Sequence, residues 1–226
     1  MLPGVSARRP DSALLLEVFH RLLSRFGPQH WWPGESPIEV MVGAILTQNT
    51  AWSNVEKAIA ALKRRRGLSL KALSRMSEES LSERIRPCGY FRVKARRLKN
   101  LIAAVQRPGH GDLDRFLSLP TKKLRDALLE VSGVGPETAD SILLYAARRP
   151  VFVVDAYTRR ALARHRWISP DAAYNEIQTL FMDRLPRDAS LFNEYHALLV
   201  VLGKGHCRPK PRCSGCPLED LLPPSA

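Results

Sequence analysis

Apolar positions recur along most of the chain at the spacing i, i+3, i+4, which is the repeat of an amphipathic helix. The pattern predicts about eleven short helices and no convincing sheet. Helix-start signals fit this division, because Pro37 and Pro170 fall near first turns, and Asp155 and Asp188 stand at N-cap or first-turn positions. The predicted helices span residues 11–26, 37–46, 52–65, 70–76, 79–85, 93–106, 121–131, 136–148, 155–165, 170–185 and 191–204.

The run PVFVVD, residues 150–155, interrupts this helical repeat. It is apolar and β-branched like a buried strand, but no second run of the same kind offers it a partner. We therefore interpret the run as an extended, buried connector between helices. The sequence as a whole predicts an all-α fold.

The net charge of the chain indicates what kind of molecule it binds. Lys and Arg number 35 against 22 for Asp and Glu, a formal net charge of +13, which favours a polyanion such as nucleic acid or an anionic membrane surface. No apolar run approaches the roughly 18–20 residues that span a bilayer, and the N-terminal stretch places Asp11 and Glu17 in a helical pattern instead of a cleavable signal. We expect a monomeric, cytoplasmic or nucleoid-associated protein that binds nucleic acid and no membrane.

Two glycines separate the predicted helices 121–131 and 136–148. Because glycine permits positive φ and close approach, the backbone N–H groups of this turn can converge on one anion at the N-terminus of the second helix, except at Pro136, which has no N–H. The alternative is an ordinary connector between two helices. The phosphate site predicted here comprises Gly133, Val134, Gly135, Glu137 and Thr138.

The segments GVGPETAD and VVDAYTRR together resemble the helix-hairpin-helix DNA glycosylases of the endonuclease III-like type, and the similarity extends from WWPGESPIEVMVGAILTQNT through CSGCPLEDL. The resemblance implies a two-lobed all-α protein. One lobe would be a six-helix barrel, residues 29–149, with the hairpin at residues 121–148. The other would combine residues 1–28 with residues 150–226 and carry a cysteine loop, residues 207–216. Double-stranded DNA would lie across the cleft between the lobes, with the damaged nucleotide flipped into it.

Asp155 is the candidate catalytic residue. Cleavage of an N-glycosidic bond builds positive charge on the deoxyribose, so a fixed and partly desolvated carboxylate stabilises the transition state. In the family that this chain resembles, the hairpin is followed by a single aspartate, and Asp155 matches it. The alternative is a helix N-cap, and both roles are compatible because a helix N-terminus keeps the carboxylate ionised.

Glu137 decides between two branches of this family. The members that also cut the DNA backbone resemble GVGxKTA at the hairpin, with a lysine that forms a Schiff base with the sugar. Glutamate has no amine nucleophile, so the sequence predicts a monofunctional enzyme that leaves an abasic site, unless another lysine reaches the sugar. Glu137 stays a second catalytic candidate, because its residue type does not decide whether it has a task of its own.

The segments HWWPGE and LTQNTAWSNVEKAI resemble the 3-methyladenine glycosylases of the endonuclease III-like type. The resemblance implies a pocket in which Trp52 and the Trp31 side sandwich the extruded base, where a cationic alkylated purine gains cation–π attraction. The alternatives are core positions for the tryptophans and caps or solvated surface for the polar residues. The residues assigned to the base and to the space it leaves are Trp31, Trp32, Pro33, Trp52, Gln48, Asn49 and Lys204; candidate phosphate contacts are Lys94, Arg96, Arg97, Arg159 and Arg160.

Three functions stay open at this point. The first is a monofunctional glycosylase that releases alkylated purines of the 3-methyladenine type. The second is an endonuclease III-like glycosylase for oxidised or mismatched pyrimidines, with weak or no lyase activity at abasic sites. The third is a non-catalytic, structure-specific DNA-binding protein, against which Asp155 argues because binding alone does not need it.

Cys207, Cys213 and Cys216 form the pattern C-x5-C-x2-C, which in a reducing compartment suggests a metal before a disulfide. The iron–sulfur members of the family resemble C-x6-C-x2-C-x5-C, so the first interval is one residue short and Leu222 replaces the last cysteine. Three thiolates can hold a [4Fe–4S] cluster with an atypical fourth ligand such as His206, or a [3Fe–4S] cluster. Zinc and no metal at all are the alternatives, and the remaining cysteine, Cys88, is expected to be a buried side chain.

Overall fold

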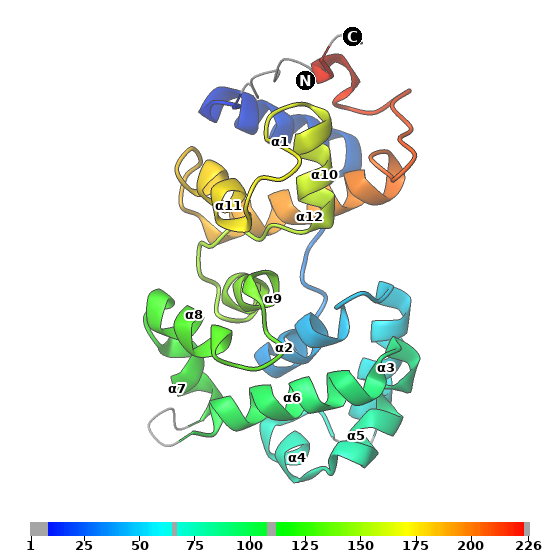
Figure 1. Ribbon diagram of the computed structural model, residues 1–226, viewed down its shortest axis with the longest axis vertical. Coiled ribbons are helices and arrows are strands. Elements are labelled where there is room, and N and C mark those ends of the chain that lie inside the picture. The colour runs from blue at the N-terminus through cyan, green and yellow to red at the C-terminus, as the bar shows by residue number, and fades with distance from the viewer. Residues whose placement is uncertain (1–8, 65–66, 108–111, 224–226) are drawn as a thin grey trace. The chain divides into compact units, whose positions relative to one another are not determined.

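Helices and loops make up all of the chain that the structure, a computed structural model, describes: residues 9–64, 67–107 and 112–223 (Figure 1). No strand occurs in these ranges, so the all-α prediction is confirmed. The chain folds into two compact units. We call Trp32–Arg149 the hairpin unit, and Met1–Trp31 together with Pro150–Ala226 the terminal unit.

The hairpin unit is built around α2 (Pro37–Leu46). This helix is apolar on every side, and nine of its ten residues are buried, as expected for a helix at the centre of a core. Its partners include α6 and the turn that follows α9. The other helices are α3 (Trp52–Lys63), α4 (Leu70–Arg75), α5 (Glu78–Arg84), α6 (Phe91–Val105), α7 (Leu113–Ser118), α8 (Thr121–Leu129) and α9 (Pro136–Ser141), with a 3-10 turn at Arg86–Cys88 and a π-helical turn at Ile142–Ala146.

The terminal unit is built around α12 (Ala189–Gly205), which packs against α1 (Ser12–Phe26) and α10 (Ala156–Arg164) (Figure 1). A Cβ atom at Gly203 would lie 2.3 Å from Cδ1 of Tyr157, so glycine is what allows α10 to approach α12 this closely. The unit also contains α11 (Tyr174–Met182) and a 3-10 turn at Glu219–Leu221.

The connector predicted at residues 150–155 is confirmed, because these residues have no regular structure and the four from Val151 to Val154 are buried. Phe152 stacks on Phe181 of α11, with 3.8 Å between the ring centroids. The Phe152 carbonyl accepts the Gln178 Nε2–H at 2.7 Å, so the extended backbone finds a partner outside any sheet.

The predicted starts at Asp155 and Asp188 are confirmed, since each side chain accepts a backbone N–H from the first turn of its helix. The start at Pro170 is wrong. α11 begins at Tyr174, and the Ala172 N–H donates to the Ser169 carbonyl in a separate turn. The apolar repeat continues through this turn, which explains why the predicted helix starts four residues before α11.

Two further differences concern helices of the hairpin unit. α7 was not predicted. The predicted helix 136–148 is α-helical only to Ser141 and then widens, with the Ala147 N–H donating to the Ile142 carbonyl at 3.0 Å. No residue in the sequence marks this change of helix type.

Lys94 of α6 is buried, with 2% of its surface exposed. Its Nζ donates to the carbonyls of Leu46 and Cys88, each at 2.9 Å, and to the Thr50 hydroxyl. Burial lowers the pKa of Lys94 below its usual value. The prediction of a phosphate contact is wrong for this residue, because its ammonium group joins the end of α2 to the turn before α6.

We predict that Lys94→Met lowers the free energy of unfolding by about 2–4 kcal/mol, because methionine fills the space but leaves the two buried carbonyls and the hydroxyl without a donor. Arg96→Met on the same helix is the control and should change stability by less than about 0.5 kcal/mol, since Arg96 is exposed. Urea unfolding measures both variants. Equal midpoints for the two would contradict the role given to Lys94.

Candidate active site

Asp155 stands where the buried connector meets α10. Its Oδ1 accepts the Thr158 N–H at 2.7 Å, and its Oδ2 lies 3.5 Å from Nε2 of His196 on α12. The Asp155 side chain is 12% exposed and the His196 side chain 6%. The carboxylate is therefore a fixed group in a largely dry environment.

The protonation state of Asp155 follows from two opposing effects. Burial disfavours the charged form and by itself raises the pKa of Asp155. The His196 imidazole and the Thr158 N–H outweigh burial, so the pKa of Asp155 lies below its usual value. The side chain is ionised at neutral pH, which is the form that can stabilise a positive charge on a sugar.

Trp31 lies along one face of α12 in the terminal unit. Its carbonyl accepts the Asn193 Nδ2–H at 2.6 Å, and its ring meets the His196 ring edge-on, with 6.1 Å between centroids. The exposed Lys204 places Nζ 5.9 Å from the Trp31 ring centroid. Three residues on one face of a single helix thus hold this half-buried indole in place.

Trp32 and Trp52 form an aromatic cluster in the hairpin unit. The two rings meet edge-on, with 5.4 Å between centroids, and Tyr145 packs on Trp32 at 5.2 Å. Trp52 Nε1 donates to Glu56 at 2.9 Å, and Pro33 is exposed. The cluster leaves both indoles half-buried and not fully within the core.

The hairpin connects α8 to α9 by a tight turn in which Gly133 has a φ of +97°. A Cβ atom there would lie 2.3 Å from Cγ of Arg97, so both the backbone angle and the space require glycine. Arg125 of α8 donates to both carboxylate oxygens of the buried Asp140 of α9, at 2.7 and 3.0 Å. This bidentate pair fixes the two helices of the hairpin to each other.

The amides of the turn are not equivalent. The Val134 N–H donates to the Val131 carbonyl at 2.9 Å and closes the turn, which corrects the expectation that it points to an outside anion. Glu137 is exposed, and Thr138 is buried, in the first turn of α9.

Gln48 follows α2 and is held by the hairpin. Its Nε2 donates to the Gly133 carbonyl at 3.1 Å and to Thr138 Oγ1 at 2.9 Å, while its Oε1 accepts a hydrogen bond from Arg97 at 2.5 Å. Asn49 is exposed in the left-handed conformation, with a φ of +51°. Gln48 therefore supports the turn, a task that its position in the sequence did not predict.

The remaining candidate phosphate contacts divide in two. Arg159 donates to the Ala172 carbonyl, and Arg160 donates to the Cys207 carbonyl, so these two guanidinium groups have partners within the terminal unit. Arg96 is exposed on α6. It is the member of the predicted set that presents its side chain to solvent.

The three cysteines of the C-terminal loop line one pocket. His206 and Leu222 line it as well, so the residue that replaces the expected fourth cysteine faces the same space. Burial, with Cys213 and Cys207 nearby, raises the pKa of Cys216. Within the described ranges, no three His, Cys, Asp or Glu side chains converge closely enough to hold a metal ion. The loop thus provides a pocket and three thiols, but not a converged metal centre.

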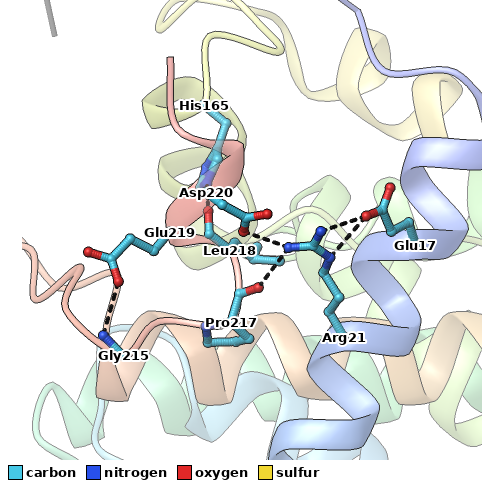
Figure 2. A network of polar contacts seen from close by, with 8 residues as sticks. All are labelled: Glu17, Arg21, His165, Gly215, Pro217, Leu218, Glu219 and Asp220. Carbon is cyan, nitrogen blue, oxygen red and sulfur yellow. Dashed lines mark hydrogen bonds and ion pairs between the residues drawn. The ribbon is translucent and has the colours of Figure 1, made fainter. Parts of the chain in front are cut away.

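Side chains from α1 and α10 fix this loop. Arg164 lies 3.3 Å from Cys207 Sγ and donates to the carbonyls of Arg208 and Pro209. Figure 2 shows the other side of the loop, where Arg21 bridges Glu17 and Asp220 and reaches the Pro217 carbonyl. His165 Nε2 lies 3.2 Å from the Leu218 carbonyl in the same network. Cys88 is buried in the hairpin unit, as predicted.

The pattern that describes the HhH-GPD superfamily of base excision DNA repair proteins matches residues 42–187. The chain belongs to this superfamily. A protein of Methanocaldococcus jannaschii whose name places it among the DNA repair glycosylases is 45% identical over 209 residues, 92% of this chain and 95% of the relative.

Two solved structures resemble this glycosylase. A 3-methyladenine DNA glycosylase of H. pylori bound to 1,N6-ethenoadenine superposes with a TM-score of 0.74 at 28% identity, over 86% of this chain and 98% of that one. A trapped covalent complex of endonuclease III with DNA gives a TM-score of 0.79 over 94% of this chain and 96% of that one; its 22% identity shows the fold alone. The chain is an enzyme that acts on N-glycosyl bonds. None of the helices described here is long and apolar enough to cross a membrane.

Three residues have contacts or conformations that the sequence did not predict. His196 faces Asp155 from α12, and Arg97 was considered only for phosphate although it holds Gln48. Tyr90 is 76% exposed and adopts the left-handed conformation, with a φ of +45°, just before α6. A large exposed aromatic residue in a strained conformation is the signal that could have marked Tyr90, but φ is not visible in a sequence.

We predict that Gly133→Ala destabilises the glycosylase by about 1–3 kcal/mol through the positive φ, and further by displacing Arg97 from Gln48. Gly135→Ala is the matched control, because Gly135 has a negative φ and an added Cβ meets no atom within 4 Å. Chemical unfolding measures stability, and affinity for an abasic-site duplex measures the state of the hairpin. A Gly133→Ala variant that resembles Gly135→Ala in both measurements would disprove the requirement for glycine at this turn.

Proposed function

We propose that this glycosylase is monofunctional and hydrolyses the N-glycosidic bond of alkylated purines of the 3-methyladenine type. The observation that carries the proposal is that Asp155 is buried and ionised, while α9 carries Glu137 in its first turn and no lysine. The carboxylate supplies negative charge for the developing positive charge on the sugar and can orient a water molecule. Glu137 cannot form a Schiff base, so the expected product is an abasic site in an uncut strand.

The aromatic side chains support the choice of an alkylated purine. Trp31 is held along α12, and Trp32 and Trp52 are half-buried, so indole surface is available for stacking on a flipped base. Alkylation at N3 or N7 makes the purine cationic and weakens its bond to the sugar, so stacking and cation–π attraction suffice for selection. Lys204 already lies near the Trp31 ring, but its exposed side chain can move aside for the base. The similarity to the H. pylori 3-methyladenine glycosylase points the same way.

We propose double-stranded DNA with a damaged base as the partner. We assign the phosphate contacts to the backbone amides of Gly133, Gly135, Glu137 and Thr138. Val134 is not among them, because its N–H closes the turn and its side chain is buried. Asn49 and Tyr90 are exposed on the hairpin unit, and we propose that they enter the space that the flipped base leaves. Gln48 can enter the same space only if its hydrogen bonds to the Gly133 carbonyl and to Thr138 Oγ1 break when DNA binds.

We predict that the protein releases 3-methyladenine from a panel of duplexes with single lesions, that strand breaks appear only after alkali, and that borohydride traps no covalent complex. Asp155→Asn should slow release at least about 100-fold, because it removes the negative charge. Asparagine is as good an N-cap as aspartate, so α10 and the affinity for DNA should be retained. Preferential release of an oxidised pyrimidine, or binding without release of any base, would contradict the proposed activity.

We also propose that Cys207, Cys213 and Cys216 hold an iron–sulfur cluster. Three thiols around one pocket match three of the four ligands of a [4Fe–4S] cluster or the ligands of a [3Fe–4S] cluster, and Leu222 supplies no fourth. When bound, such a cluster would cross-link the loop.

We predict that anaerobically purified protein is brown and contains iron and sulfide. Cys213→Ala should lose both, because it removes a ligand, whereas Cys88→Ala should keep both, because Cys88 is a buried thiol of the other unit. Metal analysis and visible absorbance measure the outcome. Zinc in place of iron, or no metal in the wild-type protein, would refute the cluster.

A further inference from the structure

A buried histidine lies beside the proposed catalytic carboxylate. His196 is 5% exposed and occupies the face of α12 that also carries Asn193 and Lys204. One side of its ring faces Trp31, and its Nε2 lies 3.5 Å from Asp155 Oδ2. An imidazole between a candidate base-stacking ring and a carboxylate can influence both.

The two oxygens of the Asp155 carboxylate are held differently. Oδ1 accepts the Thr158 N–H at 2.7 Å, which is a well-formed hydrogen bond. One bond leaves the plane of the carboxylate poorly fixed, because the terminal torsion of aspartate is broad. The contact of Oδ2 with His196 is longer than a good N–H···O bond and corresponds to an ion-pair distance. Catalytic contacts of this kind commonly shorten in the substrate complex.

We propose that His196 is a positioning residue that directs an Nε2–H at Asp155 Oδ2, fixes the plane of the carboxylate and favours its ionised form. The inference rests on the proposed role of Asp155 and adds a residue to it. The effects on the pKa of Asp155 support the role of His196, because the His196 contact is the largest of those that lower this pKa against the effect of burial. The packing of α10 against α12 brings the two side chains together.

Other charged groups on the surrounding elements have different partners. Glu194 accepts the Gln29 N–H, and Arg160 donates to the Cys207 carbonyl. Within the described residues, His196 is the ionisable group whose charge acts on Asp155. The other charged or titratable groups on the helices packed here are Glu17, His20, Arg21 and Arg25 of α1, Tyr157, Arg159 and Arg164 of α10, and Tyr195 and Lys204 of α12.

We predict that His196→Leu slows base release at least about tenfold at neutral pH in single-turnover assays and moves the acid limb of the pH–rate profile to higher pH. The sign follows from Asp155, whose ionised form is active: His196 lowers the pKa of Asp155, so its removal raises that pKa and the rate is lost earlier on acidification. Affinity for an abasic-site duplex should change less than about threefold, because the carboxylate stabilises the transition state more than the bound DNA.

His196→Gln separates positioning from charge. The glutamine amide can place a donor near the former Nε2 but cannot be protonated, so it should restore most of the rate while the acid limb returns only part of the way to its wild-type position. His165→Leu is the matched control, because His165 is a second buried histidine of the terminal unit, and it contacts the carbonyls of Ala161 and Leu218. This control should lower thermal stability and leave the acid limb unmoved.

A measurement without catalysis completes the test. Melting temperatures of Asp155→Asn, His196→Leu and the double variant should be non-additive if the two side chains interact. An unmoved acid limb in His196→Leu, or a rate that His196→Gln does not restore, would reduce His196 to a packing residue and overturn the inference. Full activity of Asp155→Asn would instead overturn the assignment of Asp155, so the two failures can be told apart.

Discussion

A carboxylate that must stay ionised although it is buried is the constraint on which the terminal unit depends. Burial disfavours the charged form of Asp155, and two contacts stabilise that form. The Thr158 N–H at the N-terminus of α10 binds one carboxylate oxygen, and the His196 imidazole lies near the other. The contact with His196 requires α10 to pack closely on α12, which Gly203 permits by leaving room for Tyr157. The backbone, the packing and the electrostatics of this unit therefore serve the same group.

The hairpin unit solves the same problem for a buried cation, Lys94, and for a second buried carboxylate, Asp140. Lys94 is matched by two carbonyls and a hydroxyl, and Arg125 is matched by both oxygens of Asp140. Desolvated charges are tolerated because each has partners that satisfy it. The consequence for function is rigidity, since a hairpin that is held by a bidentate ion pair presents its amides at fixed positions.

The sequence predicted features that arise between residues close together in the chain. It did not predict contacts between residues that lie far apart in the chain. Amphipathic repeats and side-chain caps such as Asp155 and Asp188 arise within a few residues, and they identified most helices. Short motifs such as GVGPETAD identified the family. Nothing in the sequence places His196 against Asp155, or buries Lys94 while exposing Arg96 two positions later, because tertiary packing decides both. Gln48 was interpreted from its position alone, and its hairpin partners lie far along the chain.

The cysteine loop shows how a ligand can be lost without the loss of a conformation. Arg164, Arg160 and Arg21 bind loop carbonyls and the Asp220 carboxylate, and none of these contacts involves a metal. A loop that protein groups already hold does not need four metal ligands to keep its shape, so Leu222 can stand where a cysteine is expected. Arg164 also lies 3.3 Å from Cys207 Sγ, so the contacts that fix the loop hold the backbone of this cysteine and reach its sulfur atom.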